Sequence, residues 1–111
     1  MKRDYKLYLN DIRESIRYIE EYTAGVTEYD FKNDKKLQDA VIRRLEIIGE
    51  ASRNIPLSLK KKNKEVPWFE MAQFRDFIAH SYFEASIDRI WKTLRKRVPE
   101  LKELLRKIKP V

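Results

Sequence analysis

Apolar residues recur at helical spacing through the first half of the chain and predict two long helices. The first runs from about Asp4 to Tyr22, and Gly25 follows it where a C-terminal cap is expected. The second begins after Asn33, a candidate N-cap, and ends near Asn54. The apolar stripes of these two helices are formed by Tyr5, Tyr8, Leu9, Ile12, Ile16 and Ile19, and by Leu37, Val41, Leu45, Ile48 and Ala51.

The sequence also predicts one close contact between helices and two connecting segments. Gly49 lies inside the second helix, which indicates that another helix approaches closely at that point. The segment 27–31, with Thr27, Tyr29 and Phe31, is expected to be a loop. The polar stretch 56–67 is expected to be a second connection, with at most one helical turn after Ser58.

Two further helical segments complete the chain. Pro67 is expected to open a third helix over residues 68–80, because the missing N–H of proline costs nothing in a first turn. Ser86 is a candidate cap for a fourth helix, which Pro99 should kink or interrupt near Val98 before helix continues toward the end. No strand pattern or repeat is present. The sequence therefore predicts an all-α, antiparallel four-helix bundle with a short additional C-terminal helix.

Length and composition limit the class of protein. A chain of 111 residues fits one domain, here expected to cover residues 1–111. It has no cysteine, which excludes a disulfide scaffold and a thiolate metal site. Neither a signal peptide nor an apolar run of membrane-spanning length is recognisable, so we expect a cytoplasmic protein. The net charge is +7, with nine basic and three acidic residues in 87–111. Nucleic acid is therefore a possible partner, although a solvated helix face explains the same charges.

The only histidine, His80, follows Arg75 by five residues in the stretch FRDFIAHSY. On a helix this spacing separates the two side chains by about 140° and roughly 7.5 Å, so they cooperate only if the helix ends near His80. Cleavage of RNA by its 2′-hydroxyl needs a base, an acid and positive charge at the phosphorus. His80 can supply proton transfer and Arg75 a phosphate-binding fork, without any metal. Alternatively, His80 caps a helix end and Arg75 forms an ordinary ion pair.

One histidine cannot serve as base and acid in the same step. Tyr82 or a lysine could supply the second group. A twofold homodimer would instead bring a second His80 opposite the first, and twofold dimers are the commonest oligomers.

Three stretches carry a resemblance to a known family. They are RRLEIIGEA at residues 43–51, VPWFEMAQFRDFIAHSYF at 66–83 and IDRIWKTLRKRVPELKELL at 87–105. Together with the Arg-x4-His-x-Tyr motif, they resemble the HepT-like toxins of the HEPN superfamily over nearly the whole chain. The resemblance implies a homodimeric, metal-independent endoribonuclease whose paired motifs line the dimer cleft, with Arg75 and His80 catalytic.

The same resemblance implies a mode of control. In this family the partner is a minimal nucleotidyltransferase antitoxin, MntA, which transfers AMP from ATP to the motif tyrosine, here Tyr82. No cofactor is implied. Asp76 stands where asparagine is common, and an aspartate can orient His80 but also repels phosphate. The alternative function is a non-catalytic HEPN module that binds a nucleotidyltransferase or RNA.

Several other residues admit two interpretations. Glu46 and Glu50 could face the motif, but ion pairs with nearby arginines are a simpler explanation. Trp68 and Trp91 lie in apolar patterns, which favours packing over base stacking. The lysines of residues 60–64 could follow a phosphate backbone or form a solubilising loop.

Overall fold

The computed structural model describes residues 3–80 and 83–109, and for 83–86 only the backbone is described. Within these ranges the chain is helical and contains no strand. The main helices are α1 (Tyr5–Thr23), α3 (Lys35–Arg53), α5 (Trp68–His80), and a C-terminal run of α6 (Phe83–Lys92), η1 (Thr93–Arg97) and α7 (Val98–Arg106). The short helices α2 (Glu28–Lys32) and α4 (Leu57–Lys62) connect them. The predicted all-α, four-helix HEPN-type architecture is confirmed.

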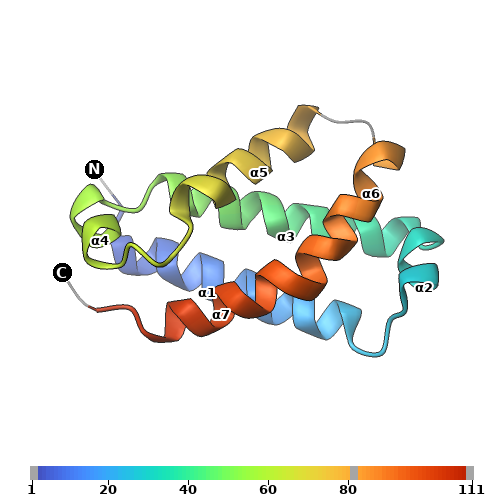
Figure 1. Cartoon of the computed structure of the whole chain (residues 1–111), viewed down its shortest axis with the longest axis horizontal. Helices are drawn as coiled ribbons and strands as arrows, with labels where there is room; N and C mark the ends of the chain where they lie inside the picture. Colours follow the sequence, from blue (N-terminus) through green and yellow to red (C-terminus); the bar gives the residue numbers. More distant parts are fainter. Residues whose placement is uncertain (1–2, 81–82, 110–111) are drawn as a thin grey trace.

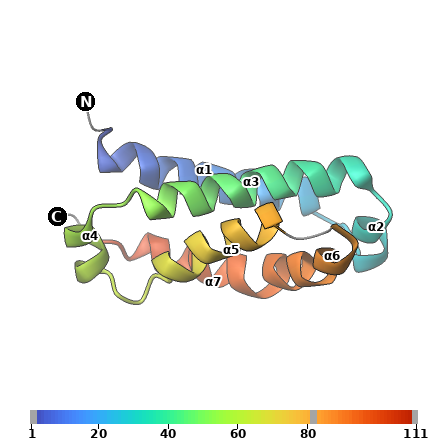
Figure 2. The same cartoon turned by 90° about the horizontal axis from the view of Figure 1, so that it is seen from above.

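The bundle is elongated, with principal dimensions of 43 × 28 × 23 Å. Helices α1 and α3 pack antiparallel along its length, and α5 packs on the other side of α3 (Figure 1). The C-terminal run crosses the bundle, with α7 contacting α1 and α6 contacting α2. The start of α1 and the end of α7 lie at the same end of the bundle as α4, as Figures 1 and 2 show.

The predicted apolar stripes form the core. Ile12, Phe31, Val41 and Leu59 are completely buried, and most members of both stripes are buried beside them. Trp68 and Trp91 are also buried, which confirms that they pack in the protein interior. At roughly 25 cal/mol per Å² of apolar surface, this burial is the main stabilising contribution to such a small bundle.

Two helix starts differ from the prediction. Residues 27–31 were expected to be a loop, but residues 28–32 form α2, because Thr27 and Asp30 form a reciprocal capping box at its start. Asn33 was expected to cap the next helix, but it ends α2, and the Asp34 side chain accepts the Leu37 N–H at 3.1 Å instead. The carboxylate of Asp34 is the better-placed acceptor for the orphan N–H groups of the first turn.

The C-terminal helices also differ from the prediction. Helix α6 begins at Phe83, so Ser86 lies inside the helix rather than at its cap. Pro99 interrupts regular winding as predicted, but through the π-helical turn η1 instead of a sharp break. The N–H of Val98 bonds to the carbonyl of Thr93, five residues back. This wider turn accommodates a proline that lacks an N–H and would clash with the carbonyl four residues earlier.

Candidate functional site

The predicted motif lies at the C-terminal end of α5. Arg75 and Asp76 are in its last turns, and His80 is its final residue, as the spacing requires. Tyr82, the predicted modification site, lies outside the described residues. Helix α5 thus carries Arg75, Asp76 and His80 on its C-terminal half, which lies away from both ends of the elongated bundle (Figures 1 and 2).

Gly49 of α3 lies directly beneath Arg75. A Cβ at position 49 would lie 2.9 Å from the Met71 carbonyl oxygen and 3.1 Å from Cγ of Arg75, and closer still to Cβ of Arg75. Carbon atoms in ordinary contact are about 3.5–4.0 Å apart. The glycine therefore allows the two backbones to approach, as its position in the sequence predicted, and this approach fixes the stem of Arg75.

The guanidinium of Arg75 is held between two carboxylates. Its Nη2 lies 3.3 Å from Oε1 of Glu50, and its Nη1 lies 3.5 Å from Oδ1 of Asp76. The second oxygen of Asp76 accepts a 2.9 Å hydrogen bond from Arg53 of α3. These four side chains form a cluster, the Arg53–Asp76–Arg75–Glu50 network, whose formal charges cancel. Since the side chains of this network are 30–50% exposed, each ion pair contributes only about 0–1 kcal/mol to the free energy of unfolding.

One atom of Arg75 differs from the rest of the network. Its Nε is buried, and among the described residues it has no hydrogen-bond partner. Buried donors without a partner are uncommon in folded proteins. The terminal nitrogens of Arg75 therefore form ordinary ion pairs, while its Nε is enclosed by the protein.

His80 is exposed, and its Nδ1 lies 2.8 Å from the main-chain carbonyl oxygen of Asp76. A carbonyl oxygen only accepts hydrogen bonds, so Nδ1 carries the hydrogen in this contact. In the neutral imidazole, Nε2 then has a free lone pair and can accept a proton. It is the main chain of Asp76 that orients the ring, while the Asp76 carboxylate binds the arginines.

Asp76 thus connects the two candidate catalytic residues. Its side chain contacts Arg75, and its carbonyl oxygen accepts from His80. Arg75 and His80 thus contact the same residue from different faces of α5, and the 140° separation expected from the spacing is bridged only through Asp76. The sequence left two interpretations of Glu50 open, and pairing with arginines on its own helix was the favoured one. The structure instead places Glu50 against Arg75 of the motif, as the other interpretation had it.

A second group of side chains flanks the motif on α5. The rings of Phe74 and Phe77 stack at 5.7 Å, and the guanidinium of Arg89 from α6 lies 4.1 Å from the Phe77 ring centre and 5.5 Å from that of Phe74. Arg89 is exposed and adds positive charge beside the motif helix. Its role was not predicted, because a residue 14 positions downstream of Arg75 leaves no local pattern.

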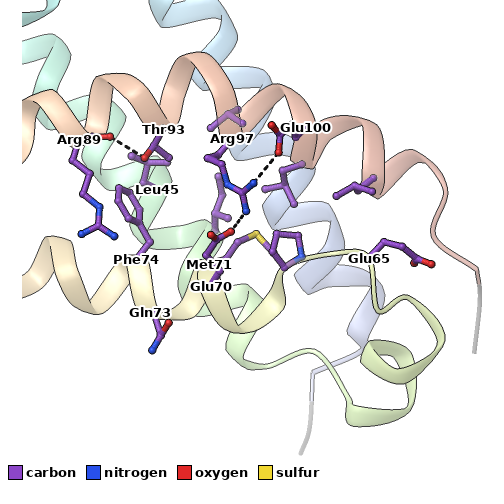
Figure 3. A pocket seen from close by; sticks show the side chains of 15 residues that line it. Leu45, Glu65, Glu70, Met71, Gln73, Phe74, Arg89, Thr93, Arg97 and Glu100 are labelled. Atoms are coloured by element: carbon purple, nitrogen blue, oxygen red, sulfur yellow. Dashed lines mark hydrogen bonds and ion pairs between the residues drawn. The ribbon is translucent and has the colours of Figure 1, made fainter.

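A pocket of about 440 Å³ lies between α5 and the C-terminal run (Figure 3). Its apolar lining includes Met71, Phe74 and Leu101, and Arg97 spans its rim to Glu70 and Glu100. The hydrogen bond from Arg97 to Glu70 raises the pKa of the Arg97 guanidinium. Neither Arg75 nor His80 lines this pocket, so it is separate from the motif.

The described part of the chain contains no cluster of three His, Asp or Glu side chains arranged to hold a metal ion. Of the helices whose residues are described, none has the length and apolar character to cross a membrane.

Comparisons with known proteins identify the family of the chain. The family model "Ribonuclease HepT-like" matches residues 12–108. The chain is 50% identical over 109 residues to a Thermococcus cleftensis protein named "Probable ribonuclease HepT", covering 98% of this chain and 99% of that one. It is 49% identical over 108 residues to a Methanocaldococcus jannaschii protein named "Gamma-glutamylcyclotransferase and putative RNase". That match covers 97% of this chain but 49% of the longer protein. No solved structure matches the chain significantly.

Proposed function

Because the chain belongs to the HepT-like ribonuclease family, we propose that it is an endoribonuclease that cleaves RNA with Arg75 and His80 at the end of α5. The observation that carries this proposal is the contact of His80 Nδ1 with the Asp76 carbonyl, which leaves Nε2 able to accept a proton. Arg75 is held by the side chain of the same aspartate. A base and a phosphate-binding cation are therefore linked through one residue.

The reaction follows from these groups. Nε2 of His80 takes the proton from the 2′-hydroxyl, whose oxygen then attacks the adjacent phosphorus. The charge that develops on the phosphorane oxygens is stabilised by Arg75, whose planar fork suits phosphate. The bond from phosphorus to the 5′-oxygen breaks, and a proton is delivered to that oxygen. The products are a 2′,3′-cyclic phosphate and a 5′-hydroxyl, and no metal takes part.

Arg75 must exchange its carboxylate partners for phosphate. Both pairs are long and partly exposed, at 3.3 Å to Glu50 and 3.5 Å to Asp76, so an incoming phosphate displaces them at little cost. Asp76 stays neutralised by Arg53, which reduces its repulsion of the substrate. The acid that protonates the 5′-oxygen is the second His80 of a homodimer, with Tyr82 or a lysine as the alternative.

The proposal includes the biological setting that the family implies. Residues 1–111 form a single HEPN domain. This domain acts as a toxin in the cytoplasm, and its antitoxin is an MntA-like nucleotidyltransferase. The Tyr82 oxygen attacks the α-phosphate of ATP, pyrophosphate leaves, and the phenol loses its proton. The AMP group so attached, two residues from His80, carries negative charge that competes with RNA for Arg75. Mass spectrometry of the protein incubated with such an enzyme and ATP tests this step, and Tyr82→Phe should accept no AMP.

The cleavage test compares wild type with His80→Ala on total RNA in the presence of EDTA. Lys96→Ala is the matched control, because it removes an exposed charge from η1 rather than from α5. Wild type and Lys96→Ala should cleave and leave cyclic phosphate ends, whereas His80→Ala should lose about 10²–10⁴-fold in rate. Equal cleavage by His80→Ala would refute the assignment.

A second candidate function is a non-catalytic module that binds RNA or a nucleotidyltransferase. The charge-neutral network around Arg75 favours it, since both motif carboxylates compete with phosphate. Under this alternative, wild type lacking any AMP on Tyr82 would bind RNA without cutting it.

A further inference from the structure

Phe69, in the first turn of α5, is one of the most exposed large apolar side chains in the described structure, at 74%. It precedes His80 by eleven residues, which on an α-helix is about 16 Å along the axis and only about 20° around it. Gln73 lies between them, seven residues before His80 and again about 20° from its direction. Phe69, Gln73 and His80 therefore form one solvent-facing row, the outer row of α5.

We infer that the outer row of α5 is a binding track for single-stranded RNA, in which Phe69 stacks against a base a few nucleotides from the cleaved phosphate. This inference rests on the proposed ribonuclease function and specifies how the substrate is held. Aromatic side chains beside a positively charged groove are the usual means of holding unpaired bases. Gln73 is exposed and supplies an amide that can hydrogen-bond a base edge.

The surroundings of Phe69 favour RNA over a protein partner. The core of a protein interface needs contiguous apolar area. The other members of the outer row, Gln73 and His80, are polar. The remaining large apolar side chains with similar exposure in the described structure lie on other helices, as Leu7 on α1, Tyr29 on α2 and Leu57 on α4. A single ring in a polar row suits a base better than a second protein surface.

Positive charge accompanies this row. Arg53 of α3 lies beside its middle, bonded to the Asp76 carboxylate and at 3.4 Å to the Ala72 carbonyl oxygen, and it is half exposed. The lysine-rich helix α4 leads into the end of α5 that carries Phe69. Because Arg53 is paired with Asp76, the lysines of α4 near the Phe69 end are the cations that would contact the phosphates of a strand bound along the row.

The test uses a short single-stranded RNA with one mapped cleavage site. Phe69→Ala should reduce kcat/KM about 5- to 150-fold, the range for losing one base–aromatic stack, while Phe69→Trp should retain most of the activity. Leu7→Ala is the matched control, because Leu7 is also an exposed apolar side chain, at 47%, but lies on α1. It should cleave like wild type.

The RNA can be altered in the same experiment. In a series of substrates, an abasic nucleotide replaces each nucleotide in turn. At one position this replacement should slow cleavage by wild type but not by Phe69→Ala, since the ring and the missing base form one interaction. If Phe69→Ala cleaves like wild type, or if the abasic effect is the same in both proteins at every position, the inference is wrong while the ribonuclease function stands.

Two further results separate the inference from its alternatives. Sedimentation of both proteins should show the same oligomeric state, and dissociation caused by Phe69→Ala would assign the ring to a subunit contact and overturn the inference. If wild type cleaves no RNA, the proposed function fails, and binding of an oligonucleotide containing 2-aminopurine still decides the stacking. Wild-type quenching that is lost in Phe69→Ala would support the track, and equal fluorescence would refute it.

Discussion

The contact between Gly49 and Arg75 makes a specific prediction for Gly49→Ala. The added methyl would meet a backbone carbonyl oxygen at 2.9 Å and the Cβ and Cγ of Arg75, none of which is the flexible tip of a side chain. To restore ordinary contact distances, α5 must move away from α3 by roughly 1 Å.

The energetic balance sets the size of the effect. Alanine gains about 1 kcal/mol over glycine inside a helix. Overpacking of this kind costs about 1–3 kcal/mol, and the rigid atoms involved place it near the upper end. We expect a net loss of about 1–2 kcal/mol in the free energy of unfolding, which lowers Tm by roughly 4–8 °C. Urea unfolding followed by circular dichroism measures this change.

The displacement should also affect cleavage. A shift of about 1 Å in a catalytic group can cost up to 10²-fold in rate, so Gly49→Ala should lose activity at temperatures where it is fully folded. Gly25→Ala is the matched control. Gly25 has a φ of +73° and nothing within 4 Å of an added Cβ, so this substitution strains the backbone by about 1 kcal/mol without touching the motif. If Gly49→Ala proves more stable than wild type and fully active, the close approach is wrong.

Three other predictions follow from contacts described above. Glu50→Gln in a catalytically inactive background should tighten RNA binding up to about five-fold by fluorescence anisotropy, because Arg75 loses a competing carboxylate. The hydrogen bond from Lys32 lowers the pKa of the Asp88 carboxyl, so the pair stabilises the fold above the ordinary carboxyl pKa, and this contribution is lost as the pH falls through the lowered value. Lys32→Ala should therefore raise the pKa of Asp88 in an NMR titration. Phe31→Ala should cost about 3–5 kcal/mol in urea unfolding, because the ring is completely buried.

Each of these has a result that would contradict it. Glu103→Gln is the control for Glu50→Gln, since it removes an exposed carboxylate from α7, and equal effects would indicate only a change in net charge. An unchanged Asp88 pKa would show that the pair does not form in solution. A loss below about 1 kcal/mol for Phe31→Ala would mean that α2 is not anchored in the core.

The helices were predictable because burial is periodic. The stripes of α1 and α3 place an apolar side chain on the same side every three or four residues, and the structure buries those sides. Gly49 was predictable as a point of close approach from its own position. A glycine destabilises the interior of a helix, so it is expected there only where another helix comes close. Its neighbour Arg75 was not, because no rule of sequence spacing connects residues 26 positions apart.

The short helix α2 could have been found from its own residues. Thr27 and Asp30 have the spacing of a capping box, but the five-residue helix between two long ones lacks a periodic pattern. The ion pairs around the motif are a different case. Arg53 could pair with Glu50 on its own helix or with Asp76 on α5, and surface pairs of either kind differ by less than about 1 kcal/mol. Only the packing of α5 on α3 decides between them.

The π-helical turn η1 sets the rotational phase of everything that follows it. Such a turn accommodates one residue more than regular winding would. Deleting a single residue between Thr93 and Arg97 would remove the extra residue of this wide turn and leave the later side chains pointing in nearly the same direction. A deletion inside α7 has no such compensation, because each side chain after it would turn by about 100° about the helix axis, and Leu105, now buried, would rotate out of the interior. In the C-terminal run, tolerance of a lost residue is therefore confined to η1.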